Sequence, residues 1–273
     1  MNYIERTAMK IRHLPSLSGL DCLWDFVRPS YDMFIRLVYS RKGLIRVING
    51  TDVIHIYPEC RDILETYEPN FWRRLMAEIQ EGDIIADVGA FVGVYTIALA
   101  RRVGSTGKVI AFEPDVKNCA LLRKHITLNN VSSSVEVHDI AVGDLHGLLR
   151  FHSQADAESH VIAPDEFKVG KESVEVQSKT LDEVFYARKV DIIKIDVEGY
   201  EEKVLRGAQS ILRRKSGYPR AIFVEVHPYV WDKLGNEGER LLSLLRGENY
   251  RIETADGTTV NSITQYGRII AVK

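Results

Sequence analysis

Apolar residues in the middle of the chain form short runs, and these runs alternate with segments that carry apolar positions every three or four residues. The runs occupy residues 84–88, 109–112 and 191–197, and residues 116–128 show the second pattern. Short apolar runs between turn residues are typical of buried strands, whereas a 3.6-residue period is typical of helices that pack on a sheet. The pattern therefore predicts an α/β domain built on a largely parallel sheet.

The last part of the chain changes this pattern. Residues 221–226 form another apolar run, and residues 251–254 and 268–272 are short segments that can pair as an antiparallel hairpin. With a further strand over residues 135–139, the runs predict a seven-stranded sheet whose last strand is antiparallel. The helical segments between the strands are expected to cover both faces of this sheet.

The N-terminal residues 1–80 do not follow the alternation and are expected to form an extension of one helix and one hairpin. Apolar positions recur at helical spacing over residues 14–40, interrupted by Pro29. Two β-like segments then flank Asn49-Gly50, which is typical of a type I′ hairpin turn. The extension is expected to cover the substrate pocket; the alternatives are a helix that seals the sheet edge or one that touches a membrane surface.

Residues 145–178 interrupt the domain that is expected over residues 81–273. They contain two alternating segments, residues 148–151 and 173–178, with a polar stretch between them. This predicts a hairpin inserted between two strands of the sheet. Because it precedes strands whose carboxyl ends build the expected site, we expect the insertion to cover the substrate pocket as well.

Composition and charge exclude several classes of protein. The chain has 273 residues, is 45% hydrophobic and 27% charged, and carries a formal net charge of −2. Such a charge gives no basic field for nucleic acid, and no apolar stretch is long enough for a membrane span. The three cysteines share no metal-ligand spacing, and no secretory signal pattern is present. A protein of a reducing compartment, the cytoplasm, is therefore expected.

A glycine-rich turn follows the first strand of the domain. Asp87 ends the apolar run, Gly89 and Gly93 follow it, and the next strand ends in Glu113, twenty residues after Gly93. The glycines permit a tight turn and the close approach of a ligand. The open N–H groups of a helix N-terminus suit an anionic group, and an acid one strand away can bind ribose hydroxyls. The two motifs predict a site for a nucleoside-containing cofactor.

The spacing of the glycines distinguishes two kinds of cofactor. A dinucleotide fingerprint reads Gly-x-Gly-x-x-Gly, but Phe91 stands at the second glycine position, where its ring would obstruct a pyrophosphate. The order Asp-x-Gly-x-x-x-Gly instead resembles the first motif of class I S-adenosylmethionine-dependent methyltransferases. The alternative is an ordinary βα turn without a ligand, and Glu113 argues against it.

Ionisable residues end two further predicted strands. Lys194, Asp196 and Glu198 lie two residues apart and therefore share one face of their strand. Glu225 and His227 end the next strand in the same way. Ligands of open α/β sheets bind at the carboxyl ends of strands, so these residues predict a catalytic site beside the glycine-rich turn. The alternative is an internal salt bridge between Lys194 and a glutamate, together with carboxylates that cap helices.

Several segments together resemble the FkbM family of methyltransferases over about residues 65–230. They are Asp87-Val-Gly-Ala-Phe-Val-Gly-Val-Tyr-Thr96, Ala111-Phe-Glu-Pro114, Leu128-Asn-Asn130, Ala141-Val-Gly-Asp144 and Lys194-Ile-Asp-Val-Glu-Gly-Tyr-Glu201. The last segment is the most specific. The chain departs from the family at Phe91, where Asn is usual, which removes a side-chain hydrogen bond near the cofactor. The resemblance implies the Rossmann-like class I fold, S-adenosyl-L-methionine as cofactor, and O-methylation of a hydroxyl on a sugar, glycolipid or natural product.

The resemblance also implies roles on the cofactor side. Asp87 would lie under the methionine part of the cofactor, with the hydroxyls of Tyr95 and Thr96 near its carboxylate. Glu113 would accept hydrogen bonds from both ribose hydroxyls, and residues 139–141 would border adenine. The candidate cofactor-binding residues are Glu68, Asp87, Gly89, Ala90, Gly93, Tyr95, Thr96, Glu113, Pro114, Asp139, Ile140 and Ala141.

On the acceptor side, methyl transfer is an in-line attack, so the enzyme must align the hydroxyl and activate it. A positioned base is worth about 10²–10⁴-fold, and His227 and Asp196 are the candidates for this base. A divalent metal ion could lower the pKa of the hydroxyl instead, with Asp196, Glu225 and His227 as candidate ligands and Glu198 as a further one. The candidate catalytic residues are Asp196, His227, Glu198, Glu225 and Lys194.

A small-molecule or glycan acceptor is expected, and two other classes of function stay open. An RNA or protein methyltransferase would use the same cofactor site. The somewhat basic residues 1–46 leave an RNA substrate open as an alternative, although enzymes that act on RNA usually add a basic, aromatic-rich module. A non-catalytic cofactor-binding protein would gain nothing from ionisable groups in its site. Transfer of a labelled methyl group to glycan, lipid or RNA fractions distinguishes these classes.

Overall fold

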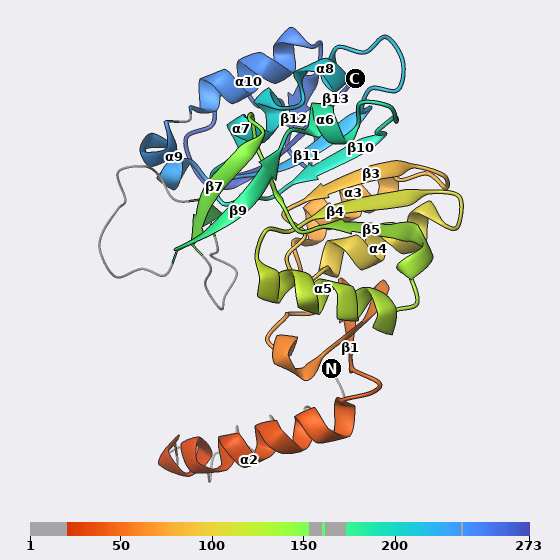
Figure 1. Ribbon diagram of the computed structural model, residues 1–273, viewed down its shortest axis with the longest axis vertical. Helices are drawn as coiled ribbons and strands as arrows, with labels where there is room; N and C mark the ends of the chain where they lie inside the picture. The colour runs from red at the N-terminus through yellow and green to blue at the C-terminus, as the bar shows by residue number, and fades with distance from the viewer. Residues whose placement is uncertain (1–20, 153–159, 162–172, 236) are drawn as a thin grey trace.

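A seven-stranded sheet forms the centre of the protein, in the order β12-β13-β11-β10-β3-β4-β5 (Figure 1). The computed structural model describes residues 21–152, 160–161, 173–235 and 237–273. The strands of the sheet are β3 (Ile84–Val88), β4 (Lys108–Phe112), β5 (Val135–His138), β10 (Ile192–Ile195), β11 (Ala221–Val226), β12 (Arg251–Glu253) and β13 (Gly267–Val272). Neighbours among β3, β4, β5, β10 and β11 are parallel, and β13 is antiparallel to both β11 and β12. The predicted sheet, with its antiparallel last strand, is confirmed.

Helices cover both faces of this sheet. On one face, strand residues such as Val109 and Phe223 share a core with α3 (Pro69–Glu78), α4 (Val94–Val103) and α5 (Val116–Leu128). The helices of the other face are α6 (Leu181–Val184), α7 (Glu201–Arg206), α8 (Gln209–Leu212), α9 (Pro228–Leu234) and α10 (Gly238–Gly247). Side chains alternate between the faces along each strand, so Asp87 and Lys194, which interrupt the apolar runs, point toward the first core.

The N-terminal extension lies beside α4 and α5. It consists of α2 (Asp21–Tyr39), β1 (Leu44–Ile48), β2 (Asp52–Ile56) and the short helix η2 (Pro58–Cys60). Asn49 and Gly50 both have positive φ, and the Thr51 N–H donates to the Ile48 carbonyl at 3.0 Å. β1 and β2 pair antiparallel across this turn. The hairpin predicted from Asn49-Gly50 is therefore confirmed.

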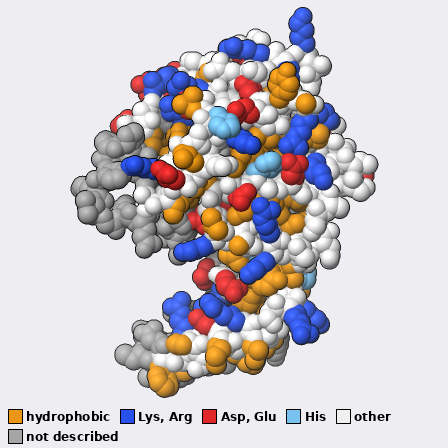
Figure 2. Space-filling view, in the orientation of Figure 1, with side chains coloured by type: hydrophobic (Ala, Val, Ile, Leu, Met, Phe, Trp, Pro, Cys, Tyr) orange, Lys and Arg blue, Asp and Glu red, His pale blue; other side chains and the backbone are white. Residues whose placement is uncertain are grey.

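Helix α2 runs through Pro29, so the predicted interruption there is wrong; residues 14–20 lie outside the described part. Pro29 is exposed, and water can bind the carbonyl that lacks its helical N–H partner. Ile35 is buried, whereas Phe26, Met33 and Leu37 are exposed. The helix extends away from the sheet (Figure 1), and hydrophobic side chains gather along the lower edge of the molecule in Figure 2. Among the described helices, none combines the length and apolar character needed to span a bilayer.

The inserted segment and the short strand β6 before it form a second sheet of four strands, in the order β6-β9-β7-β8. Its strands are β6 (Ala141–Val142), β7 (Gly147–His152), β8 (His160–Val161) and β9 (Ser173–Lys179). β7 and β9 pair antiparallel, which confirms the predicted inserted hairpin. Phe151 and Val176 form a small core with Ala141, which follows the end of β5. This contact holds the insertion beside the carboxyl ends of the central strands (Figure 1).

Candidate active site

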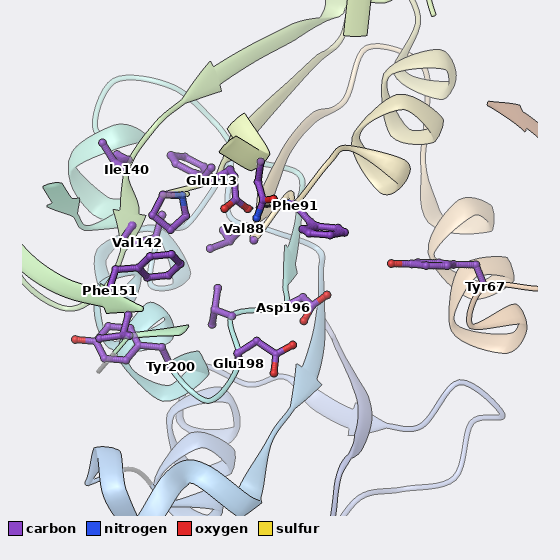
Figure 3. A pocket seen from close by; sticks show the side chains of 17 residues that line it. Tyr67, Val88, Phe91, Glu113, Ile140, Val142, Phe151, Asp196, Glu198 and Tyr200 are labelled. Atoms are coloured by element: carbon purple, nitrogen blue, oxygen red, sulfur yellow. Dashed lines mark hydrogen bonds between the residues drawn. The ribbon is translucent and has the colours of Figure 1, made fainter. Parts of the chain in front are cut away.

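A pocket lies at the carboxyl ends of the central strands, where the predicted motifs meet (Figure 3). Glu113 lies on one side of it, and Asp196 and Glu198 lie on the other. Tyr67 comes from the N-terminal extension, and Phe151 comes from the insertion. The predicted site residues that line the pocket are Gly89, Glu113, Pro114, Ile140, Ala141, Asp196 and Glu198. The other predicted site residues, among them Lys194, Glu225 and His227, do not line the pocket.

Gly89 brings the glycine-rich turn against the end of β10. It has a φ of 79°, and a Cβ atom built on it would lie 1.7 Å from the backbone oxygen of Asp196. The N–H groups of Gly89 and Ala90 donate to the Phe112 carbonyl at 3.1 and 3.0 Å. Sequence analysis attributed this glycine to the approach of a ligand. In the structure the nearest obstacle to a side chain is the neighbouring strand end.

Glu113 is buried at the end of β4 and is held by backbone donors. Its Oε2 accepts from the Phe91 N–H at 2.8 Å, and its Oε1 accepts from the Asp115 N–H at 2.9 Å. Burial raises the pKa of Glu113 to about 7, although these hydrogen bonds and one from Asn118 oppose the rise. Each carboxylate oxygen can accept more than one hydrogen bond. The side chain therefore fits the predicted role toward a ribose.

Phe91 stands in the left-handed region, with a φ of 50°. Asn is enriched in this region several-fold over other non-glycine residues, which accounts physically for the family's preference at this position. The Phe91 N–H donates to Glu113, and the aromatic ring lies in the pocket lining.

Lys194 joins β3 and β10 from inside the first core. Its Nζ lies 3.6 Å from Asp87 Oδ1 and 3.3 Å from Asp196 Oδ2, and it donates to the Gly89 carbonyl at 3.2 Å. Burial lowers the pKa of Lys194, but the carboxylates of Asp196 and Asp87 outweigh burial and raise it. The ammonium stays charged and positions the strand ends. Sequence analysis considered an internal salt bridge between Lys194 and a glutamate; in the structure Lys194 pairs with Asp87 and Asp196 instead.

The hydroxyls of Tyr95 and Thr96 bond to protein carboxylates. Thr96 donates to Asp87 Oδ2, and Tyr95 donates to Glu68 Oε2, both at 2.6 Å. Asp87 is fully buried, and burial raises its pKa. None of these four residues lines the pocket, nor does Asp139, which is exposed. Their predicted contact with the cofactor stays a prediction.

Asp196, Glu198 and His227 form the acceptor cluster at the ends of β10 and β11. One ligand atom from each of them lies within 4.8 Å of the others. His227 is buried; its Nδ1 lies 2.6 Å from Glu201 Oε1, and its Nε2 lies 3.4 Å from Glu198 Oε2. Burial lowers the pKa of His227, but its hydrogen bond to Glu201 and the nearby carboxylates raise it to about 9. Burial also raises the pKa of Glu198.

Glu225 belongs to a different contact set. Its Oε1 accepts from Arg268 at 2.7 Å and also from the Tyr266 hydroxyl. Burial, reinforced by Asp196 and Glu68, raises the pKa of Glu225 to about 7. The structure thus separates Glu225 from the acceptor cluster and puts Glu198 in the place that sequence analysis gave to Glu225.

Comparison with known proteins assigns the family. Residues 87–252, more than half of the chain, match the Methyltransferase FkbM domain. The chain belongs to the FkbM methyltransferase family. It is an enzyme, an S-adenosylmethionine-dependent methyltransferase of the FkbM type.

Individual relatives are distant. The chain is 27% identical to 31-O-demethyl-FK506 methyltransferase FkbM of Streptomyces tacrolimicus over 244 residues, which are 76% of this chain and 88% of that protein. It is 29% identical to Methyltransferase 1 of Beauveria bassiana over 153 residues, 48% of this chain and 61% of the fungal protein, so it spans about three fifths of that relative. A solved O-methyltransferase of Thermotoga maritima superimposes with a TM-score of 0.45 at 17% identity, over 76% of this chain and 66% of that one.

Several functional residues were missed by sequence analysis. Glu201, which holds His227, lies within the most specific sequence segment but was given no role there. Phe151 lies in the predicted hairpin, yet nothing in its spacing indicates that its ring faces the pocket. The lining residues without an assigned role in the sequence analysis are Tyr67, Val88, Phe112, Asn118, Val142, Phe151, Val161, Val197 and Tyr200.

Proposed function

We propose that this FkbM methyltransferase methylates a hydroxyl group of a small molecule such as a sugar unit or a natural product. The observation that carries the proposal is the acceptor cluster, in which Asp196, Glu198 and the buried His227 converge beside the pocket. The Streptomyces relative is named for an O-demethyl natural product, which supports an oxygen acceptor. A glycan or lipid hydroxyl belongs to the same chemical class.

Glu113 and the turn over residues 89–93 would hold the cofactor. When bound, S-adenosylmethionine supplies an electrophilic methyl group on a sulfonium. Glu113 offers free lone pairs to the ribose hydroxyls, and Ile140 and Ala141 give the adenine ring an apolar border. Gly89 leaves backbone exposed to the pocket, as close approach of a ligand requires.

The acceptor cluster would orient and activate the hydroxyl. Lys194 fixes Asp196, and Glu201 fixes His227, so both side chains are held in place before the acceptor arrives. The Asp196 carboxylate, at hydrogen-bond distance, can draw the proton from the acceptor oxygen, which makes that oxygen a better nucleophile. His227, whose pKa is raised to about 9, holds its own proton at neutral pH and would orient the hydroxyl. Alignment of the oxygen with the methyl group supplies the other part of the rate.

Transfer of a radiolabelled methyl group tests the proposal. The purified chain would be incubated with labelled S-adenosylmethionine and with separated small-molecule, glycan, lipid, RNA and protein fractions. We expect label in a small-molecule, glycan or lipid fraction, as an ether methyl that survives mild alkali. Label confined to RNA or protein would assign one of the alternative functions. Failure to bind S-adenosylhomocysteine would overturn the cofactor site itself.

We also propose that residues 41–80 and the insertion cover the pocket. Tyr67 from the first segment and Phe151 and Val161 from the second line it, whereas no described residue of α2 does. Phe151 lies in the pocket lining, so replacing it with alanine removes part of the wall against which the cofactor would pack. S-adenosylhomocysteine should then bind about tenfold more weakly, which corresponds to about 1.4 kcal/mol. Calorimetry measures this. The matched control is Leu148→Ala on the same strand, because Leu148 is exposed; equal loss in both variants would contradict the pocket role.

Binding of S-adenosylhomocysteine should strengthen as the pH rises from 6 to 8. The ribose hydroxyls donate most strongly to the ionised form of Glu113, whose pKa burial raises to about 7. Protonation below pH 7 weakens these hydrogen bonds because it removes the charge and occupies one of the oxygens. The ionised fraction, and with it the affinity, should change about tenfold over this range. Titration calorimetry at several pH values measures the effect. Glu113→Gln cannot ionise and should bind weakly at every pH; an unchanged slope in this variant would assign the dependence to another group.

A further inference from the structure

The acceptor cluster has the composition and the supporting contacts of a metal centre. We propose that Asp196, Glu198 and His227 bind one divalent transition-metal ion. The role of that ion, to hold the acceptor hydroxyl, rests on the proposed function. The existence of the site does not, because it follows from the three side chains and their neighbours.

The three donor groups fit one ion. Their ligand atoms lie within 4.8 Å of one another, and metal–ligand bonds of about 2.1–2.3 Å on opposite sides of an ion span nearly this distance. The Glu198 side chain is 27% exposed, and the Tyr229 hydroxyl approaches it only at 3.4 Å, so a small rotation can complete the set. One imidazole and two carboxylates leave coordination positions open, and these face the pocket that Asp196 and Glu198 line.

His227 is held as metal-binding histidines are held. Its Nδ1 lies 2.6 Å from the fully buried Glu201, whose other oxygen accepts from the Trp231 indole at 2.8 Å. A carboxylate behind the imidazole fixes the ring and its tautomer and strengthens it as a ligand. The other nitrogen, Nε2, is directed into the cluster, 3.4 Å from Glu198, which is longer than a good N–H···O hydrogen bond. An ion there would displace the proton from Nε2.

The surrounding charge favours a cation. Four carboxylates, those of Asp87, Asp196, Glu198 and Glu201, lie in the cluster or beside it. The ammonium of Lys194 contacts Asp87 and Asp196, and the imidazole of His227 contacts Glu198 and Glu201. Lys194 contacts the Oδ2 atom of Asp196, which leaves Oδ1 for an ion. Glu225, a ligand candidate from the sequence, is turned to Arg268 and Tyr266 and is not part of this set. The corrected ligand set is therefore Asp196, Glu198 and His227.

In the proposed reaction the ion would bind the acceptor oxygen. A divalent ion stabilises the alkoxide form, so the hydroxyl proton leaves to water at a lower pH. The oxygen then forms its bond to the methyl carbon, and the sulfur keeps the electron pair of the bond that breaks. The protein side chains and the acceptor oxygen would bind the same ion. The oxygen would then lie at Asp196 and Glu198, on the side of the pocket opposite Glu113 (Figure 3).

Binding of Mn²⁺ and Zn²⁺ to the metal-stripped full chain, without cofactor, tests the site. Electron paramagnetic resonance counts free Mn²⁺, and calorimetry follows Zn²⁺. We expect one ion per chain. Substituting a residue that only hydrogen-bonds to a metal ligand typically lowers metal affinity by about 10–100-fold. His227→Ala and Glu198→Gln each remove a ligand itself, so each should weaken binding at least that much. Glu225→Gln is the matched control, since it removes a neighbouring carboxylate that is no ligand, and it should bind nearly as wild type.

The outcomes separate the metal site from the proposed function. If wild type binds neither ion, or if His227→Ala binds as tightly as wild type, the site is overturned, even where S-adenosylhomocysteine binds and a hydroxyl is methylated. If the ion binds but no hydroxyl accepts the label, the site stands and its role is overturned. Should His227→Ala fail to fold, Glu198→Gln decides the test, because the Glu198 side chain is partly exposed.

Discussion

Asp196→Asn is expected to lower the turnover number by about 10²–10⁴-fold while the affinity for S-adenosylhomocysteine changes little. The substitution keeps the shape of the side chain but removes its charge from the centre of the acceptor cluster. Lys194 keeps Asp87 as a buried partner, so the fold should persist. Either mode of activation, direct or through an ion, needs the charge. Transfer of a labelled methyl group to the native acceptor measures the turnover number.

A matched control separates this effect from a general loss of charge. Asp232 lies on the nearby helix α9, is exposed, and belongs to no part of the site. Asp232→Asn should therefore turn over like the wild type. Circular dichroism and calorimetry show whether Asp196→Asn is folded and binds the cofactor product. A folded Asp196→Asn variant with wild-type turnover would refute the catalytic role of the cluster.

Gly89→Ala is expected to lower the free energy of unfolding by at least about 3 kcal/mol. The added Cβ would lie 1.7 Å from the Asp196 carbonyl oxygen, so β3 and β10 would have to separate at their carboxyl ends. Both are central strands, and the displacement would disturb the buried contact between Lys194 and Asp87. Urea denaturation measures the free energy of unfolding.

Gly50→Ala isolates the part of this effect that comes from backbone conformation alone. Gly50 has a φ of 76°, close to the 79° of Gly89, but a Cβ there would meet nothing within 4 Å. This control should cost only about 1 kcal/mol, the usual cost of a side chain in the left-handed region. Equal losses in the two variants would show that the approach of Asp196 contributes nothing.

Much of the fold could be predicted because its signals are local. Apolar runs such as residues 109–112 give buried strands, and the Asn49-Gly50 pair requires two positive φ angles that few other residues tolerate. The prediction of an interruption at Pro29 was wrong, although proline does remove one hydrogen-bond donor from a helix. Because this part of the helix is exposed, water can bind the carbonyl that is left without a partner. A pattern within one segment cannot report how much of that segment the rest of the protein covers.

The site could be predicted in part, because strand ends are local but the pairings between them are not. The sequence places Asp196 and His227 at the ends of two strands, and the structure brings them together. It cannot reveal that Glu201 bonds His227 while Glu225 is turned to Arg268, since these pairings depend on side-chain direction across segments. Sequence analysis also missed that Gly89 is needed because the Asp196 carbonyl lies against it. Asp196 is more than a hundred residues away in the sequence, so no local pattern indicates this contact.

The contact between Gly89 and Asp196 also bears on how such an enzyme can be redesigned. The turn on the donor side and the cluster on the acceptor side meet backbone against backbone, so the separation of the two reacting groups does not depend on the surface segments that close the pocket. Swapping the inserted strands β7 and β9 for those of another family member should therefore leave the contact between Gly89 and Asp196 intact, although it replaces Phe151 in the pocket lining.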